Sequence, residues 1–159
     1  MVSQIPIGGT GCLGGRSTTG LLARYNKSIV LWRSKLQKTI SLSTAEAEYY
    51  AASEIAIEII YLRNLLHNMG FQQGDDSPVY EGNTACIKWG NHIVGRRERA
   101  KHIDIRKHFA HEVIHNPHTR LVRVSTSQQL ADIFTKALPL QHFERCVIGL
   151  MRGPAPKGP

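Results

Sequence analysis

The stretch that decides the fold is residues 43–70, which reads STAEAEYYAASEIAIEIIYLRNLLHNMG. Ser43 stands three residues before Glu46, the spacing of a capping box at the start of a helix. Apolar residues then recur at helical spacing through 47–66, and Gly70 is a typical C-terminal stop. The pattern predicts one long helix over about 44–69, in which Glu46 serves the cap and Glu48 points elsewhere.

Shorter elements are predicted on both sides of this helix. Before it, residues 17–32 form two apolar runs around Asn26-Lys27, which is typical of a β-hairpin, and 33–41 read as a loop. After it, we expect strands at 78–81 and 119–125, and helices at 84–89, 103–115, 127–138 and 142–151. Ser127 would cap the helix at 127–138, and Pro139 would end it. This order indicates a mixed α/β layer architecture with helices on a sheet.

Composition favours a polyanionic partner and a reducing compartment. The chain has 159 residues, a net charge of +8 and a pI near 9.7, so nucleic acid is the first candidate partner. Its three cysteines are widely spaced, which suggests neither a disulfide framework nor a CxxC metal site. We find no signal peptide and no apolar run able to span a membrane, and we therefore expect an intracellular protein without a membrane partner.

Five motifs, in order along the chain, point to one family. They are RSTTG (16–20), SKLQKTISLSTAEAEY (34–49), YEGNTACI (80–87), AKHIDIRKHF (100–109) and SQQLADIFTKALP (127–139). Together they resemble the ribonuclease H domain of copia-type (Ty1/copia) retrotransposon polyproteins, and several motifs in order are more specific than one short pattern.

The resemblance implies a ribonuclease H-like α/β fold, a mixed five-stranded sheet with helices packed on it. We expect this domain over 11–151, after a degenerate, weakly ordered N-terminus (1–10) and before a disordered tail (152–159). The first strand would be poorly formed, because glycines and Pro6 in residues 4–12 suit a strand badly. The chain begins without the reverse transcriptase region that precedes this domain in the family, which suggests a truncated or decayed copy.

The family cleaves the RNA strand of RNA–DNA hybrids by two-metal hydrolysis, with Mg²⁺ or Mn²⁺ held by four carboxylates. The resemblance places two of these on Glu48 and Asp132. The two other acidic positions fall on Gly82 and, by a looser alignment, on Pro6. Residues 1–45 contain no Asp or Glu, so another alignment does not supply the first-strand acid.

A site with two of four carboxylates would bind metal weakly through Glu48 and Asp132, and we expect it to be catalytically defective. Glu81, next to Gly82, is a candidate to replace the acid lost there. Because neighbouring strand residues face opposite sides of a sheet, we expect Glu81 to point away from the site.

Two further clusters are candidate sites. The basic loop formed by Arg96, Arg97, Arg99 and Lys101 is suited to contacting the phosphates of a hybrid, although it could also be a solvated basic face. The stretch HEVIH, from His111 through Glu112 to His115, matches a zinc-hydrolase pattern on a predicted helix, but a third ligand is not evident.

Three functions stay open at this point. The first is a degenerate ribonuclease H-like nuclease that acts on RNA–DNA hybrids next to a reverse transcriptase region in an intact polyprotein. The second is a non-catalytic nucleic-acid-binding remnant. The third is a zinc-dependent hydrolase built on HEVIH.

Overall fold

The computed structural model describes residues 2–4, 16–38, 40–41, 43–92 and 101–152. They form a mixed five-stranded sheet in the order β3-β2-β1-β4-β5. The strands are β1 (Val2–Gln4), β2 (Thr18–Tyr25), β3 (Ser28–Leu36), β4 (Ser77–Glu81) and β5 (Thr119–Arg123). β1 pairs antiparallel with β2 and parallel with β4, which confirms the predicted mixed five-stranded sheet.

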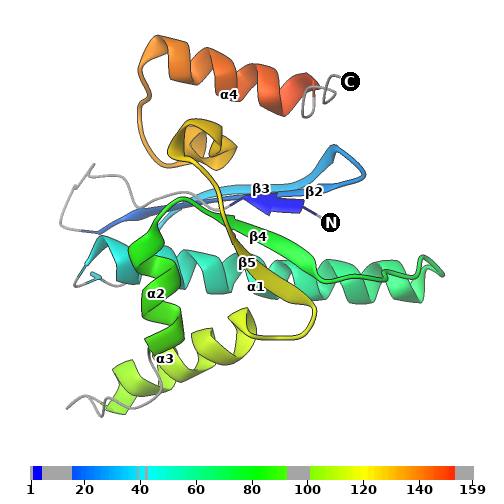
Figure 1. The fold of residues 1–159 in the computed structure, drawn as a ribbon, viewed down its shortest axis with the longest axis vertical. Helices are drawn as coiled ribbons and strands as arrows, with labels where there is room; N and C mark the ends of the chain where they lie inside the picture. Colours follow the sequence, from blue (N-terminus) through cyan, green and yellow to red (C-terminus); the bar gives the residue numbers. More distant parts are fainter. Residues whose placement is uncertain (1, 5–15, 39, 42, 93–100, 153–159) are drawn as a thin grey trace.

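The helices cover the two sides of the sheet unequally. Figure 1 shows α1 (Thr44–Asn68), α2 (Thr84–His92) and α3 (Lys101–Ile114) on one side. Two short 3₁₀ turns, η1 (Thr126–Gln128) and η2 (Leu130–Phe134), lie on the other side with α4 (Leu140–Arg152). η2 contacts β2 and α4, so it joins the last helix to the sheet.

The first strand is shorter and earlier than predicted. Three residues, Val2–Gln4, occupy the central position between β2 and β4, whereas the sequence suggested residues 4–12. Of that predicted range, Gln4 is in the strand and the remainder lies outside the described residues. β3 is longer than predicted and continues to Leu36, since it pairs with β2 along its whole length.

Local chemistry explains the ends of the hairpin and of α1. Asn26 and Lys27 both have positive φ, 48° and 71°, as the tight turn of a two-residue hairpin requires. At the start of α1, the Glu46 N–H donates to Ser43 Oγ at 3.1 Å, which confirms the predicted cap. At its end Gly70 has a φ of 85°, and the Phe71 N–H donates to the Leu66 carbonyl at 2.8 Å, as in a Schellman motif.

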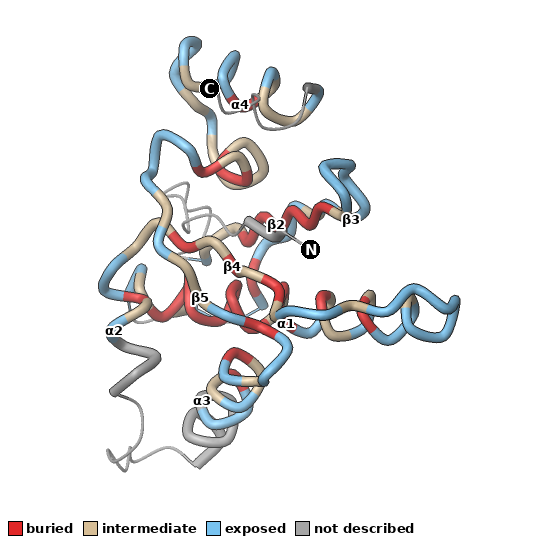
Figure 2. Tube along the Cα trace, turned by 45° about the vertical axis from the view of Figure 1, so that its right-hand side comes forward, coloured by how far each residue is buried: buried red, intermediate tan, exposed pale blue. Residues whose placement is uncertain are grey.

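The core lies between the sheet and the first half of α1 (Figure 2). Its members include Leu21 of β2, Val79 of β4, and Tyr49, Ile55 and Ile59 of α1, all 1% exposed or less. α1 is buried mainly along its first half, and the end beyond Arg63 is largely exposed. On the opposite side of the sheet, the ring of the exposed Trp32 stacks on Phe134 with centroids 5.8 Å apart.

Candidate metal centre

Glu81 ends strand β4 inside the protein. Along β4, Ser77, Val79 and Glu81 are buried, while the residues between them are partly exposed. Val79 packs in the core with α1, and residues two apart on a strand share a face, so Glu81 also faces α1. The prediction that Glu81 points away is therefore wrong. It assumed that Gly82 lies on the inward face of β4. The inward-facing residues end at Glu81, and the apolar Val79 two residues earlier is the sequence signal that marks this face.

Glu48 reaches the same region from α1. With 3.6 residues per turn, a residue two positions after Glu46 lies on a different side of the helix, away from the cap. Glu48 is 0% exposed, although carboxylates are rarely buried completely in proteins. Neither of its oxygens accepts a hydrogen bond of normal geometry from a described residue.

The turn after β4 holds Glu81 in place and brings a thiol beside it. The Asn83 N–H donates to Glu81 Oε1 at 2.9 Å, and Asn83 Oδ1 accepts from the Ala85 N–H at 2.8 Å at the start of α2. This side-chain cap starts the helix at Thr84, three residues after Glu81. Cys86, in the first turn of α2, is 0% exposed. The ligand atoms of Glu48, Glu81 and Cys86 all lie within 4.8 Å of one another.

Asp132 comes from the other side of the sheet, on η2. The predicted α-helix over 127–138 is wrong: η1 and η2 are separate 3₁₀ turns, and Ser125, not Ser127, is the residue before the first. The Gln129 side-chain amide between the turns donates to the Tyr80 carbonyl at 3.2 Å, which fixes the segment to β4. Asp132 is 0% exposed, and its Oδ2 lies 3.4 Å from Lys136 Nζ.

Burial disfavours the ionised form of the two glutamates. It raises the pKa of Glu48 to about 7; the Asn83 side chain lowers this pKa, Asp132 raises it and Lys136 lowers it by smaller amounts. Burial likewise raises the pKa of Glu81 to about 8, opposed by the Asn83 N–H and increased by the Glu48 carboxylate. These couplings place Glu48, Glu81 and Asp132 in one electrostatic cluster.

Burial also raises the pKa of the Cys86 thiol well above its ordinary value, and the neighbouring carboxylates of Glu81 and Glu48 raise it further. A divalent cation would reverse this balance, because it stabilises every ionised donor around it. The donor set thus fits a cation at Glu48 and Glu81. An acid from the first strand is lacking, since residues 1–45 contain no Asp or Glu.

The resemblance places the two other acidic positions on Gly82 and Pro6, and the structure describes only Gly82. Gly82 follows the last residue of β4 and is partly exposed, and it contributes no ligand. Pro6 lies outside the described residues. Gln4 pairs with Tyr80, so β1 runs parallel to β4 toward the end that carries Glu81.

The basic loop is largely outside the described residues. This holds for Arg96, Arg97 and Arg99, and of Lys101 the structure describes the backbone at the start of α3. Its contact with phosphates stays a prediction.

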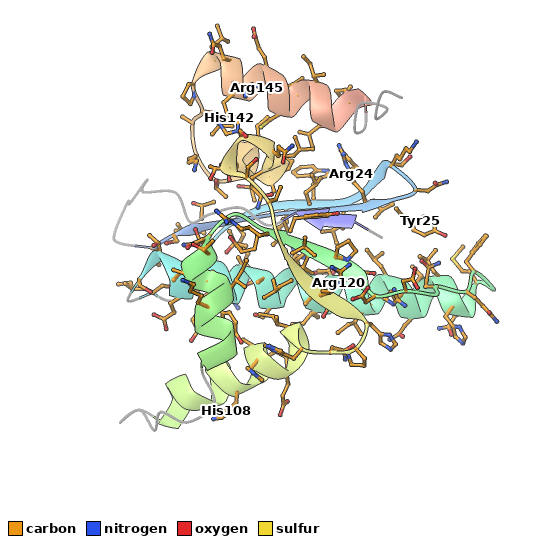
Figure 3. All side chains as sticks on the ribbon, in the orientation of Figure 1. Arg24, Tyr25, His108, Arg120, His142 and Arg145 are labelled. Carbon is orange, nitrogen blue, oxygen red and sulfur yellow. The ribbon has the colours of Figure 1, made fainter. Side chains whose placement is uncertain are left out.

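The first four residues of the HEVIH motif end α3, and His115 follows the helix. The rings of His111 and His115 stack with centroids 4.0 Å apart, while Glu112 is exposed. Figure 3 shows His108 on the same helix, at the outer side of the helix layer. Within the described part of the chain, Glu48, Glu81 and Cys86 are the only three potential ligands gathered closely enough for one ion, so HEVIH lacks a third ligand there.

Known proteins with related sequences are retrotransposon polyproteins. The Retrovirus-related Pol polyprotein from transposon TNT 1-94 of Nicotiana tabacum is 36% identical over 131 residues, 82% of this chain and 10% of the tobacco protein. Those from transposons RE2 and RE1 of Arabidopsis thaliana are each 32% identical and cover 87% of this chain and 10% of their own length. The chain thus spans about a tenth of these curated relatives. No family model matches it.

Solved structures identify the fold. LC11-RNase H1, isolated from compost by a metagenomic approach, matches with a TM-score of 0.58 at 10% identity, over 92% of this chain and 96% of the other. LC11-RNase H1 in complex with an RNA/DNA hybrid matches with a TM-score of 0.52 at 15% identity, over 84% and 92%. No helix in the described residues is long and apolar enough to cross a membrane. The chain belongs with the copia-type retrotransposon Pol sequences and has the ribonuclease H-like fold.

Proposed function

We propose that this chain is a retrotransposon-derived ribonuclease H-like domain that binds RNA–DNA hybrids and hydrolyses their RNA strand poorly or not at all. One observation carries the proposal: the buried carboxylates of Glu48 and Glu81 meet at the end of β4, and buried Asp132 raises the pKa of both, but the segment containing the first strand has no acid to join them. The polyprotein relatives and the ribonuclease H neighbour solved with a hybrid support the substrate class.

The chain's own residues have distinct parts in this proposal. Glu48 and Asp132 would hold a divalent cation, Mg²⁺ or Mn²⁺, and Glu81 lies where it can add an oxygen that Gly82 cannot. A bound cation would supply charge stabilisation at the scissile phosphate. The second cation position of a two-metal site would lack its bridging acid, and we therefore expect cleavage to be severely reduced.

Cleavage of a labelled RNA–DNA hybrid in Mg²⁺ or Mn²⁺ tests whether the site is catalytically impaired. We expect wild type to cut no faster than Glu48→Gln, which keeps the side-chain volume and removes the charge. Glu144→Gln, an exposed glutamate on α4, is the matched control. Robust cutting by wild type that disappears in Glu48→Gln would contradict the proposal of a defective site.

Binding without cleavage is the second candidate function, favoured by the net charge of +8. Hybrid affinity should then fall steeply with salt, because neutralised phosphates release counterions. If Arg96, Arg97 and Arg99 each neutralise one phosphate, their triple substitution by alanine should lower the slope of log K against log salt by about 3. Affinity that does not depend on salt would contradict this candidate.

In an intact polyprotein, a reverse transcriptase region would be the natural partner of this domain. Co-purification of this chain with the reverse transcriptase segment of a relative, expressed as separate proteins, tests this. Failure to associate at micromolar concentration would mean that covalent linkage alone keeps the two together.

A further inference from the structure

A thiol lies inside the carboxylate cluster. Cys86 of α2 stands with Glu48 of α1 and Glu81 of β4, and one ligand atom from each lies within 4.8 Å of the other two. All three side chains are 0% exposed. They come from three different elements, so the fold brings them together.

Three of the four glutamate oxygens in this cluster lack a hydrogen-bond donor of normal geometry among the described residues. Both oxygens of Glu48 and Oε2 of Glu81 accept no such bond from a described residue. Asn83 satisfies Glu81 Oε1 through its N–H and approaches Glu48 with its side chain. Buried oxygens without donors are costly, and a cation among them would offset that cost.

The three donors suit a soft or borderline ion better than Mg²⁺. Mg²⁺ requires an octahedral shell of oxygens, and sulfur is a poor ligand for it. Zn²⁺ accepts thiolate and carboxylate together in a tetrahedron, with Zn–S near 2.3 Å and Zn–O about 2.0–2.2 Å. These lengths put neighbouring donors about 3.4–3.6 Å apart, a spacing that the cluster reaches by small side-chain movements.

We propose that Glu48, Glu81 and Cys86 form a binding site for a thiophilic divalent cation, of which Zn²⁺ is the physiological representative, in preference to Mg²⁺. Binding breaks the S–H bond of Cys86 and forms a sulfur–metal bond, and the released proton passes to solvent together with any carried by the glutamates. This inference rests on the proposed function in that Glu48 belongs to both sites. It also gives a second reason to expect weak hydrolysis, because an ion held by sulfur is not placed for a two-metal reaction.

Cobalt absorption tests the site directly. The reduced full-length chain is refolded from urea with Co²⁺, so that burial does not block entry, and the thiolate-to-cobalt charge-transfer band is recorded. We expect the band in wild type, in Cys146→Ser and in Cys12→Ser, and its loss in Cys86→Ser. Cys146 is the matched control because it is also buried and free. Absence of the band in wild type, or its persistence in Cys86→Ser, would overturn the proposal.

Competition between metal ions and the Tm of the protein measure the preference for Zn²⁺ over Mg²⁺. Equimolar Zn²⁺ should displace Co²⁺, whereas a hundredfold excess of Mg²⁺ should leave the band in place. Zn²⁺ should raise the Tm of wild type by several degrees more than Mg²⁺ does, and Cys86→Ala should remove that difference. If Cys86→Ala does not fold by circular dichroism, Glu81→Gln replaces it. Displacement by Mg²⁺, or an equal rise in Tm with both ions, would overturn the preference.

The two proposals fail in different ways. Robust Mg²⁺-dependent cutting of hybrid with no cobalt band would remove the thiophilic site and leave a nuclease. A cobalt band that depends on Cys86, together with no hybrid binding at low salt, would support the metal site and remove the proposed nucleic-acid function.

Discussion

Replacing Glu81 by glutamine should change how stability depends on pH. Glu81 is completely buried, and burial raises its pKa from an ordinary value of 4.5 to about 8. Between these values the folded chain holds a proton that the unfolded chain releases. The contribution of Glu81 to stability is therefore fully present below pH 4.5 and is lost as the pH rises through about 8.

The size of the effect follows from these two values. A pKa difference of one corresponds to about 1.4 kcal/mol, so the change from 4.5 to about 8 is on the order of 4–5 kcal/mol. Such a change is a large part of the total stability of a small domain. Glutamine has nearly the same shape and cannot ionise, and Glu81→Gln should therefore be close to wild type at pH 5 and several kcal/mol more stable at pH 9.

Urea unfolding followed by circular dichroism between pH 5 and 9, with EDTA present, measures this difference. Glu144→Gln is the control, because Glu144 is exposed on α4 and its replacement should leave the pH dependence of wild type unchanged. Parallel stability curves for wild type and Glu81→Gln would refute the inward, desolvated position of Glu81. With Zn²⁺ at pH 8, wild type should be more stable than Glu81→Gln, because wild type alone keeps all three ligands.

Three further expectations concern the site and its support. Gly82→Asp alone should not restore cleavage of a labelled hybrid, because the first-strand acid is still absent; revival by this single change would show that the number of missing ligands is wrong. Gly20→Ala should lower the free energy of unfolding by about 1–3 kcal/mol in urea titrations, because the new Cβ would lie 2.7 Å from Phe134 Cβ on η2. Gly74→Ala is the control, since its Cβ would have no atom within 4 Å, and it should leave the free energy of unfolding unchanged. Ile55→Ala, in the centre of the core, should cost about 2–5 kcal/mol by the same measurement, and a smaller loss would mean that α1 packs loosely there.

The end of α4 offers a test of how the last helix is held. Arg24 of β2 is buried and donates from its guanidinium to the Gly149 carbonyl, and Figure 3 shows Arg24 on the side of the sheet that faces α4. This bond links α4 directly to β2, in addition to the contacts that α4 makes with η2. Arg24→Met should increase amide hydrogen exchange in α4 and leave α1 unchanged; equal exchange in both variants would contradict this.

The sequence by itself determined the elements whose signals are local. The cap at Ser43, the apolar spacing along α1 and the stop at Gly70 depend on neighbouring residues, and the structure confirms all three. The hairpin turn at Asn26 and Lys27 also depends on neighbouring residues alone, and the structure confirms it. The order of five motifs along the chain also pointed to copia-type Pol polyproteins, and the related sequences confirm this.

The tertiary structure decided the composition of the site. Glu81 faces inward because the register of β4 against β1 and β5 buries Val79, and the side chain two residues on must share that face. Cys86 joins the cluster because the Asn83 turn places the first turn of α2 beside it. Asp132 arrives from a 3₁₀ turn held to the Tyr80 carbonyl by Gln129, where the local sequence alone favoured a longer helix. Each of these placements depends on contacts between segments distant in the chain, and no local pattern contains them.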